Sequence, residues 1–281
     1  GYDKEGKPKP LPYLKMLNGI LPDDIRITAW TFVDPFFDAR FSCVHRTYKY
    51  LFTNQHYDLK AMQEACQYLQ GTHDFRNFCK INPSEKMNFI RNILYVSIKE
   101  NRKDVYEIEI CGRGFLWHQV RCIAAILFLI GERKESPCLI KRMLNVSKLP
   151  TRPNYEMASE FPLLLYDCGF DDISWTKETR VNSIHLHAIR QLEKHLKAQQ
   201  DHALIHYALL STIMQGGIEK TAYLNKNTFV AYKNLQKSDF NTPNYTPQRK
   251  KPYLPIEKRD RMQSYDEARA KFVKRQKNKK L

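Results

Sequence analysis

The chain has 281 residues, and its 46 lysines and arginines outnumber its 30 aspartates and glutamates, giving a net charge of +16 at pH 7. This length suits one large or two modest domains, and the positive charge indicates an anionic partner, most often nucleic acid. The longest apolar run is too short to cross a bilayer, so no membrane partner is expected. The seven cysteines form no CxxC pair and follow no signal peptide, which is typical of reduced thiols in an intracellular protein, nuclear or cytoplasmic.

Hydrophobic periodicity predicts alternating strands and helices from Arg46 onward. Strands are expected over Thr47–Thr53, Phe89–Lys99, Val105–Ile110 and Phe161–Phe170. Helices are expected from an Asp58 cap to Gly71, over Trp117–Ile130, and for a short stretch after Ser136-Pro137. This order predicts an α+β fold of the ferredoxin-like, split βαβ type, with an antiparallel sheet that has helices on one face.

The C-terminal part has a different composition. Residues 182–215 have a helical pattern, and from Gln236 the chain is rich in Pro, Asn, Lys and Arg, which predicts a basic arm. The last 33 residues, Arg249–Leu281, carry 13 basic and 4 acidic side chains, a net +9 of the total +16. The histidine pair His202 and His206 has i, i+4 spacing, but without a third ligand nearby we predict no metal site.

An arginine stands at the head of an apolar helix in the segment Gly112–Gly131. The run Ile123–Ile130 is apolar all round and predicts a buried helix, so Arg121 at its entry needs a carboxylate or phosphate partner. One interpretation is a capped core helix whose arginine reaches solvent. The other is a substrate pocket whose arginine holds a catalytic acid.

Four blocks of sequence, in order, resemble the tRNA pseudouridine synthase A family. The family's LPxDI, DARFS…RxYxY, GxHDFxxF and xFLxHxVRN/C blocks are matched by Leu21–Ile25, Asp38–Tyr50, Gly71–Phe78 and Gly114–Cys122. The strand segment Glu160–Cys168, the helical region and the basic tail are similar to the eukaryotic branch that modifies the anticodon stem-loop at positions thirty-eight and thirty-nine.

The resemblance implies a tRNA uridine isomerase that uses no cofactor and no metal. These enzymes cleave the uridine C1′–N1 bond, turn the uracil, and rejoin it through C5, so the target base must leave its stack. Tyr48 matches the tyrosine that contacts substrate, and Arg121 matches the arginine that pairs with the catalytic aspartate. Phe115 and Leu116 are expected to wall the pocket, and Arg40, Arg46 and Lys49 to contact RNA phosphates. Binding of other structured RNA and homodimerisation are left open.

The family's nucleophile motif, GRTDxGV, is not recognisable in this sequence. We therefore expect residues 1–30 to be a remnant of an N-terminal half-domain, followed by the synthase domain (31–180), a helical extension (181–235) and a basic, disordered tail (236–281). The chain alone is expected to make no detectable pseudouridine. The alternative is a non-catalytic tRNA-binding paralogue, which we disfavour because it is expected to leave Arg121 without its acidic partner.

Overall fold

The computed structural model describes residues 11–22, 24–25, 27–53, 56–171, 173, 197 and 252–278. The chain divides into two compact units, one of Gly1–Phe37 with Asp172–Pro243 and the other of Asp38–Asp171 with Asn244–Leu281. The helical extension expected over residues 181–235 lies outside the described residues, apart from Lys197.

The described part of the first unit begins with the helix α1 (Tyr13–Asn18), which the sequence pattern does not predict. The Asn18 side chain accepts a hydrogen bond from the Ile27 N–H at 2.8 Å and donates one to the Ile27 carbonyl at 2.9 Å. These two bonds join the end of α1 to the segment that follows the Leu21–Ile25 block.

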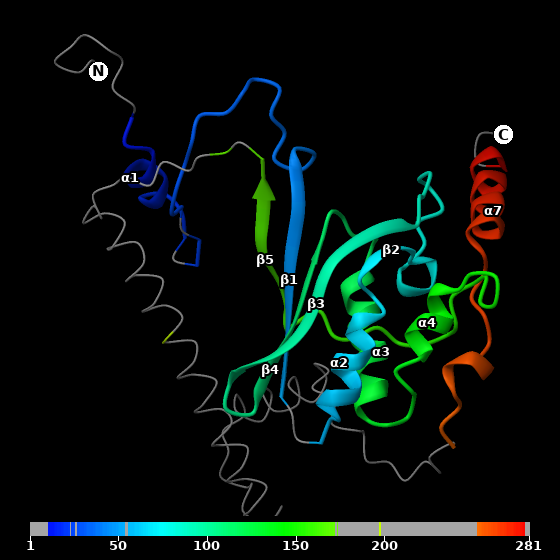
Figure 1. Cartoon of the computed structure of the whole chain (residues 1–281). Coiled ribbons are helices and arrows are strands. Elements are labelled where there is room, and N and C mark those ends of the chain that lie inside the picture. The colour runs from blue at the N-terminus through cyan, green and yellow to red at the C-terminus, as the bar shows by residue number, and fades with distance from the viewer. Residues whose placement is uncertain are drawn as a thin grey trace, which may run out of the picture. The chain divides into compact units, whose positions relative to one another are not determined.

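A five-stranded antiparallel sheet forms the frame of the second unit, with the strand order β2-β3-β4-β1-β5 (Figure 1). The strands are β1 (Cys43–Thr53), β2 (Gly71–Asp74), β3 (Ile90–Arg102), β4 (Val105–Gly112) and β5 (Leu163–Phe170). Four of them confirm the predicted strands and the α+β class. The short edge strand β2 is an addition, because its four residues GTHD carry no apolar alternation that could predict it.

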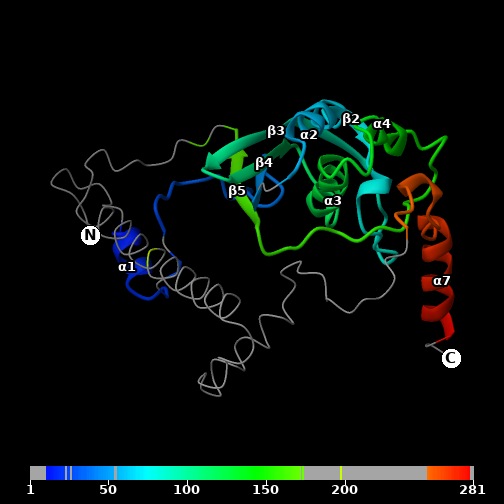
Figure 2. The same cartoon turned by 90° about the horizontal axis from the view of Figure 1, so that it is seen from below.

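Two helices, α2 (Leu59–Gln67) and α3 (Gln119–Gly131), lie side by side on one face of this sheet (Figures 1 and 2). The predicted cap of α2 is confirmed, since the Asp58 carboxylate accepts a hydrogen bond from the Ala61 N–H at 3.1 Å. The predicted end is wrong: α2 stops at Gln67, and Gly71, with a φ of 98°, instead opens β2. The short helix α4 (Leu139–Leu144) follows Ser136-Pro137 as expected.

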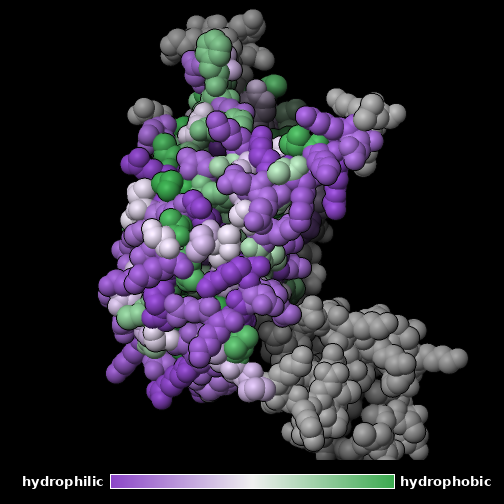
Figure 3. All heavy atoms as spheres, turned by 90° about the vertical axis from the view of Figure 1, so that its right-hand side faces the viewer, coloured by the Kyte–Doolittle hydropathy of each residue, from purple (hydrophilic) through white to green (hydrophobic). Residues whose placement is uncertain are grey.

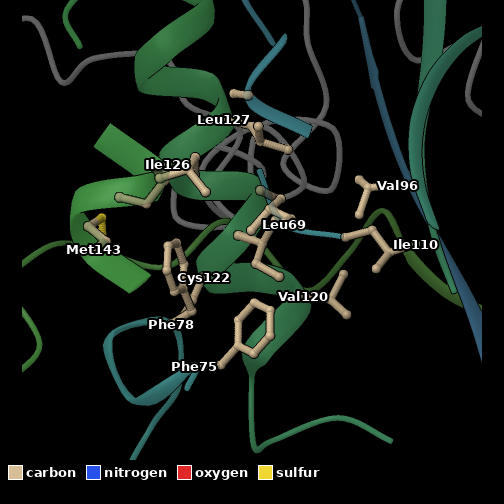
Figure 4. Close-up of a cluster of buried hydrophobic side chains, with 14 of the residues drawn as sticks. Leu69, Phe75, Phe78, Val96, Ile110, Val120, Cys122, Ile126, Leu127 and Met143 are labelled. Carbon is tan, nitrogen blue, oxygen red and sulfur yellow. The ribbon is translucent and has the colours of Figure 1, made fainter. Parts of the chain in front are cut away.

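The hydrophobic core lies between these helices and the sheet. Ile126 and Leu127 of α3 have no solvent exposure, and Figure 4 shows them among side chains from α2's end, the sheet and α4. The sheet contributes Val96 and Ile110, and α4 contributes Met143. The apolar run that predicts a buried helix therefore forms the centre of the unit. No helix of the described residues is long and apolar enough to cross a membrane.

The expectation of a disordered tail is wrong for residues 252–278. This segment forms a 3-10 helix, η3 (Ile256–Lys258), and a helix, α7 (Tyr265–Asn278). Ile256 is fully buried in the core, and the Tyr265 hydroxyl donates a hydrogen bond to the Glu85 carbonyl at 2.6 Å while its ring packs edge-on against Phe89. Composition predicts disorder for this basic segment, but Ile256 and Tyr265 dock it together with polar contacts such as the Arg142–Glu257 ion pair and the hydrogen bond from Arg269 to the Glu85 carbonyl.

Core packing predicts the effect of shortening a side chain of α3. Leu127→Ala should lower the free energy of unfolding by about 2–5 kcal/mol, because it leaves a cavity where no solvent reaches. Val273→Ala on the exposed surface of α7 is the matched control and should change it by less than about 0.5 kcal/mol. Urea unfolding followed by circular dichroism measures both, and equal effects would contradict this assignment of the core.

Candidate functional site

A hollow of about 600 Å³ opens at the end of the sheet where β1 and β3 begin and β4 ends. It is lined by Arg40, Phe41, Arg46, Tyr48, Ile90, Arg91, Asn92, Arg113, Gly114 and Phe115. The hollow thus combines aromatic rings with four guanidinium groups. It brings together four of the predicted site residues: Arg40, Arg46, Tyr48 and Phe115.

The aromatic part of the hollow is a pair of rings. The Tyr48 and Phe115 rings meet edge-to-face with their centroids 5.0 Å apart. A Cβ atom at Gly112 would lie 3.1 Å from the Phe115 ring and 3.0 Å from the Asn92 carbonyl oxygen, so the glycine makes room for this ring. Leu116 does not line the hollow and is buried in the core behind Phe115.

The Tyr48 hydroxyl is protonated at neutral pH. Burial raises the pKa of Tyr48 above its ordinary value, and the positive charge of Arg46 offsets this only in part. The hydroxyl can therefore donate a hydrogen bond or a proton into the hollow.

The four arginines of the hollow carry uncompensated positive charge. Within the described part of the chain, no carboxylate forms an ion pair with Arg40, Arg46, Arg91 or Arg113. Like charges gathered without counter-ions are unfavourable unless an anion binds among them. The hollow is therefore suited to a ligand that carries negative charge and a flat apolar surface.

A tight turn before β1 positions Arg40. The Asp38 carboxylate accepts hydrogen bonds from the N–H groups of Arg40 (2.7 Å) and Phe41 (2.8 Å), and the Ser42 hydroxyl accepts one from the Asp38 N–H at 3.1 Å. The Arg46 guanidinium donates a hydrogen bond to the Arg40 carbonyl, which joins the turn to the strand. The aspartate and serine of the DARFS block thus shape the loop, and its arginine lines the hollow.

Arg121, at the start of α3, has partners of its own. Its guanidinium pairs with the Glu160 carboxylate at 2.7 Å and donates to the Ala158 carbonyl at 2.7 Å, and it lies 3.5 Å from the His118 Nδ1. The expectation that Arg121 lacks an acidic partner when no catalytic aspartate is present is wrong, since Glu160 supplies the carboxylate. The Glu160 side chain is 76% exposed, so this carboxylate can exchange with another anion.

Lys49 lies away from the hollow, because neighbouring residues of a strand face opposite sides of the sheet. Its ammonium group bonds to the Glu107 carboxylate at 2.8 Å, lies 3.7 Å from that of Glu109, and sits 4.1 Å from the centre of the Tyr166 ring. Two carboxylates already compensate this charge. The structure therefore does not bring Lys49 to the other predicted RNA contacts.

Comparison with known proteins gives several matches. The sequence profile of the family described as tRNA pseudouridine synthase matches residues 65–171. The tRNA pseudouridine(38/39) synthases of Saccharomyces cerevisiae and Homo sapiens are 46% and 42% identical over 179 and 192 residues, which cover 63% and 64% of this chain. The chain spans 40% of the length of each of these two relatives.

The tRNA pseudouridine synthase A of Archaeoglobus fulgidus is 33% identical over 208 residues, which are 73% of this chain and 72% of the archaeal protein. The chain belongs to the tRNA pseudouridine synthase family. Family membership agrees with the resemblance predicted from the four sequence blocks, and the family match ends where β5 ends.

Four residues that line the hollow lie outside the blocks that resemble the family, and the sequence pattern does not predict them: Ile90, Arg91, Asn92 and Arg113. They come from the start of β3 and from the residue after β4, which the pairing of these two strands brings together. The predicted strands Phe89–Lys99 and Val105–Ile110 follow each other closely in the sequence, and antiparallel pairing of two such strands places their outer ends together at one end of the sheet. Among the described residues, no group of three or more His, Cys, Asp or Glu could hold a metal ion, and His202 and His206 lie outside them.

The surroundings of Lys49 predict a role in stability. Burial would raise the pKa of Glu107, but hydrogen bonds from Lys49 and Asn101 and the nearby lysine charges outweigh it and hold that pKa below its ordinary value. Lys49→Met should lower the free energy of unfolding at pH 7 by about 1–3 kcal/mol, because it leaves the 6%-exposed Glu107 side chain without its cation.

This contribution has a definite pH dependence. A glutamate with a lowered folded-state pKa stabilises the fold above its unfolded-state value of about 4.3, and the stabilisation is lost as pH falls through the folded-state pKa. Urea unfolding between pH 7 and pH 3 should show the difference between wild type and Lys49→Met shrinking toward acid. A difference that stays constant over this range would contradict the pairing.

Proposed function

We propose that this chain forms the uridine-binding part of a tRNA pseudouridine synthase that acts on uridines 38 and 39 of the anticodon stem-loop, as the names of its eukaryotic relatives describe for them. The observation that carries the proposal is the hollow, in which the Tyr48–Phe115 pair is surrounded by four arginines that have no ion-pair partner among the described residues. Flipped bases bind between aromatic or apolar side chains, and RNA phosphates bind guanidinium groups.

Each side chain has a role in this proposal. The Tyr48 ring stacks on the uracil and Phe115 walls the site, while Leu116 supports Phe115 from the core. The phosphates beside the flipped nucleotide bind Arg40 and Arg46, together with Arg91 and Arg113. Lys49 is not included, because its charge is already compensated on the other face of the sheet.

The reaction requires the protein to transfer protons at C5 and N1 and to hold a catalytic aspartate in place. The C1′–N1 bond of the uridine breaks, a C1′–C5 bond forms, and the C5 proton leaves while a proton is gained at N1. Tyr48 is a candidate for relaying the proton, since its hydroxyl lies in the hollow and is protonated: it can donate its proton toward N1, and its oxygen then accepts the proton that leaves C5. Arg121 is the candidate for holding the catalytic aspartate, and the exposed Glu160 carboxylate then gives up its place. No cofactor or metal enters this scheme.

A chimera tests the function. We expect the Saccharomyces cerevisiae relative, with its matching region replaced by that of this chain, to restore pseudouridine at tRNA positions 38 and 39 in yeast that lacks the relative. Tyr48→Phe in the chimera should lower turnover by at least about 100-fold while tRNA affinity changes by less than about threefold. Tyr166→Phe, on the other face of the sheet, is the control and should be active.

The chimera also separates catalysis from binding alone. A non-catalytic tRNA-binding role is compatible with the structure, because Glu160 gives Arg121 a charge partner without an aspartate. A folded chimera that binds tRNA but forms no pseudouridine would contradict the catalytic proposal and support the binding role.

The helix α7 should add affinity for RNA without adding sequence preference. Lys271, Lys274 and Arg275 are exposed at helical spacing, and the face of the unit that carries α7 is mainly hydrophilic (Figure 3). Changing all three to glutamine should weaken binding to every stem-loop alike and lower the slope of log affinity against log salt by up to about 3, because each phosphate contact releases about one counterion. Fluorescence anisotropy across a salt series measures both.

The control for this helix removes the same charge elsewhere. Glutamine at the exposed Lys60, Lys103 and Lys148 lowers the net charge equally but leaves α7 intact. Equal losses of affinity in the two triple variants would show that α7 has no specific role, and an unchanged salt slope in the α7 variant would exclude phosphate contacts there.

A further inference from the structure

The loop before α3 holds a pair of aromatic rings, those of the exposed Trp117 and the half-buried His118, that the proposed function does not use. The Trp117 side chain is 52% exposed, and its ring lies 4.8 Å from that of His118, with 31° between the two planes. Tryptophan is enriched at binding interfaces, where its ring offers a large apolar surface with a polar N–H at one end. The same loop carries Gly114 and Phe115, which line the hollow.

The backbone is built to present these two rings. His118 has a φ of 59°, a left-handed conformation uncommon in residues other than glycine, and it turns the chain sharply into α3. The flanking residues Leu116 and Gln119 are buried, and the Gln119 side chain accepts a hydrogen bond from the Leu116 N–H at 2.8 Å. The turn therefore buries the side chains of Leu116 and Gln119 and leaves those of Trp117 and His118 outside the core.

Positive charge surrounds the pair. The Lys80 ammonium group lies 5.3 Å from the centre of the Trp117 ring, and the Lys80 N–H donates to the Trp117 carbonyl at 3.0 Å. Arg121 lies beside His118 on the other side. Burial, Arg121 and Lys80 together lower the pKa of His118, so its imidazole is neutral at pH 7 and offers a flat uncharged ring.

We propose that Trp117 and His118 form a stacking platform for a nucleotide next to the target uridine, with Lys80 bound to the adjoining phosphate. This inference rests on the proposed function, since a flipped uridine leaves its neighbours unstacked. Single-stranded loop bases stack on aromatic side chains in a way that tolerates any base, and cations beside the ring hold the backbone. The platform thus increases the affinity for RNA and positions the loop, whereas the hollow recognises the uridine.

Affinity measurements with the full chain test the platform. The probe is a synthetic anticodon stem-loop with one loop base at a time replaced by an abasic site. Trp117→Leu should weaken binding of the intact RNA about 10-fold, and one abasic position next to the target should weaken binding of the wild-type protein by a similar factor. Tyr166→Leu, an exposed aromatic on the other face, is the matched control and should bind as wild type.

Combining the two changes distinguishes stacking from a structural effect. If Trp117 stacks on that base, Trp117→Leu should cause no further loss with the abasic RNA. A loss equal for the intact RNA and every abasic RNA would mean that Trp117 only shapes the loop, which overturns the platform. Wild-type affinity in Trp117→Leu would overturn it as well and leave the proposed function standing.

A spectroscopic readout needs no change at the platform. The chain has three tryptophans, so the double variant Trp30→Phe/Trp175→Phe leaves Trp117 as the sole source of tryptophan fluorescence. Its fluorescence should be quenched by the intact stem-loop and much less by the RNA abasic at the stacking position. If the stem-loop binds but does not quench the Trp117 fluorescence, the platform is excluded and the proposed function still stands. If the protein does not prefer the stem-loop to a scrambled RNA, the proposed function itself is contradicted.

Discussion

The burial of α3 is the constraint on which the rest of the second unit depends. An apolar helix gains stability when most of its surface is covered, and here the buried side chains of α3 pack in one core with those of α2, α4 and the sheet, while Phe128 and Leu129 are half-buried. In this position, the polar N-terminal end of α3 lies beside β1. This is why His118 and Arg121 lie in the same region of the fold as Tyr48 and Tyr50, and why Arg121 influences the Tyr50 hydroxyl.

Because alternate residues of β1 face opposite sides of the sheet, the two sides have different chemical environments. On the helical side of β1, Tyr48 faces Phe115 and a group of arginines that no carboxylate pairs with in the described part of the chain. On the other side, Lys49 lies among Glu107, Glu109 and Tyr166, where its charge is compensated. Two adjacent residues of one block therefore have opposite roles, one suited to binding an anionic ligand and one to holding the sheet together.

The sequence predicts this fold well where a single hydrophobic period or a local cap specifies an element. It predicts poorly the contacts between residues that are far apart in the sequence. The apolar run of α3 and the Asp58 cap are local signals, and both are confirmed. Glu160 could not be assigned to Arg121 from spacing, because 39 positions separate them and only the path of β5 brings them together. The docking of α7 and the segment before it likewise uses residues such as Ile256 and Tyr265, whose partners lie far away in sequence.

The central claim is that a uracil enters the hollow and stacks on the Tyr48 ring, with Phe115 as a wall of the site. Photocrosslinking tests it directly, with 4-thiouridine placed at position 38 or 39 of an anticodon stem-loop bound to the full chain and the attachment site mapped by mass spectrometry. The account predicts attachment at Tyr48 or Phe115, lost when the labelled base is moved into the stem. Attachment confined to Lys49 and Tyr166, on the opposite face of the sheet, would contradict it.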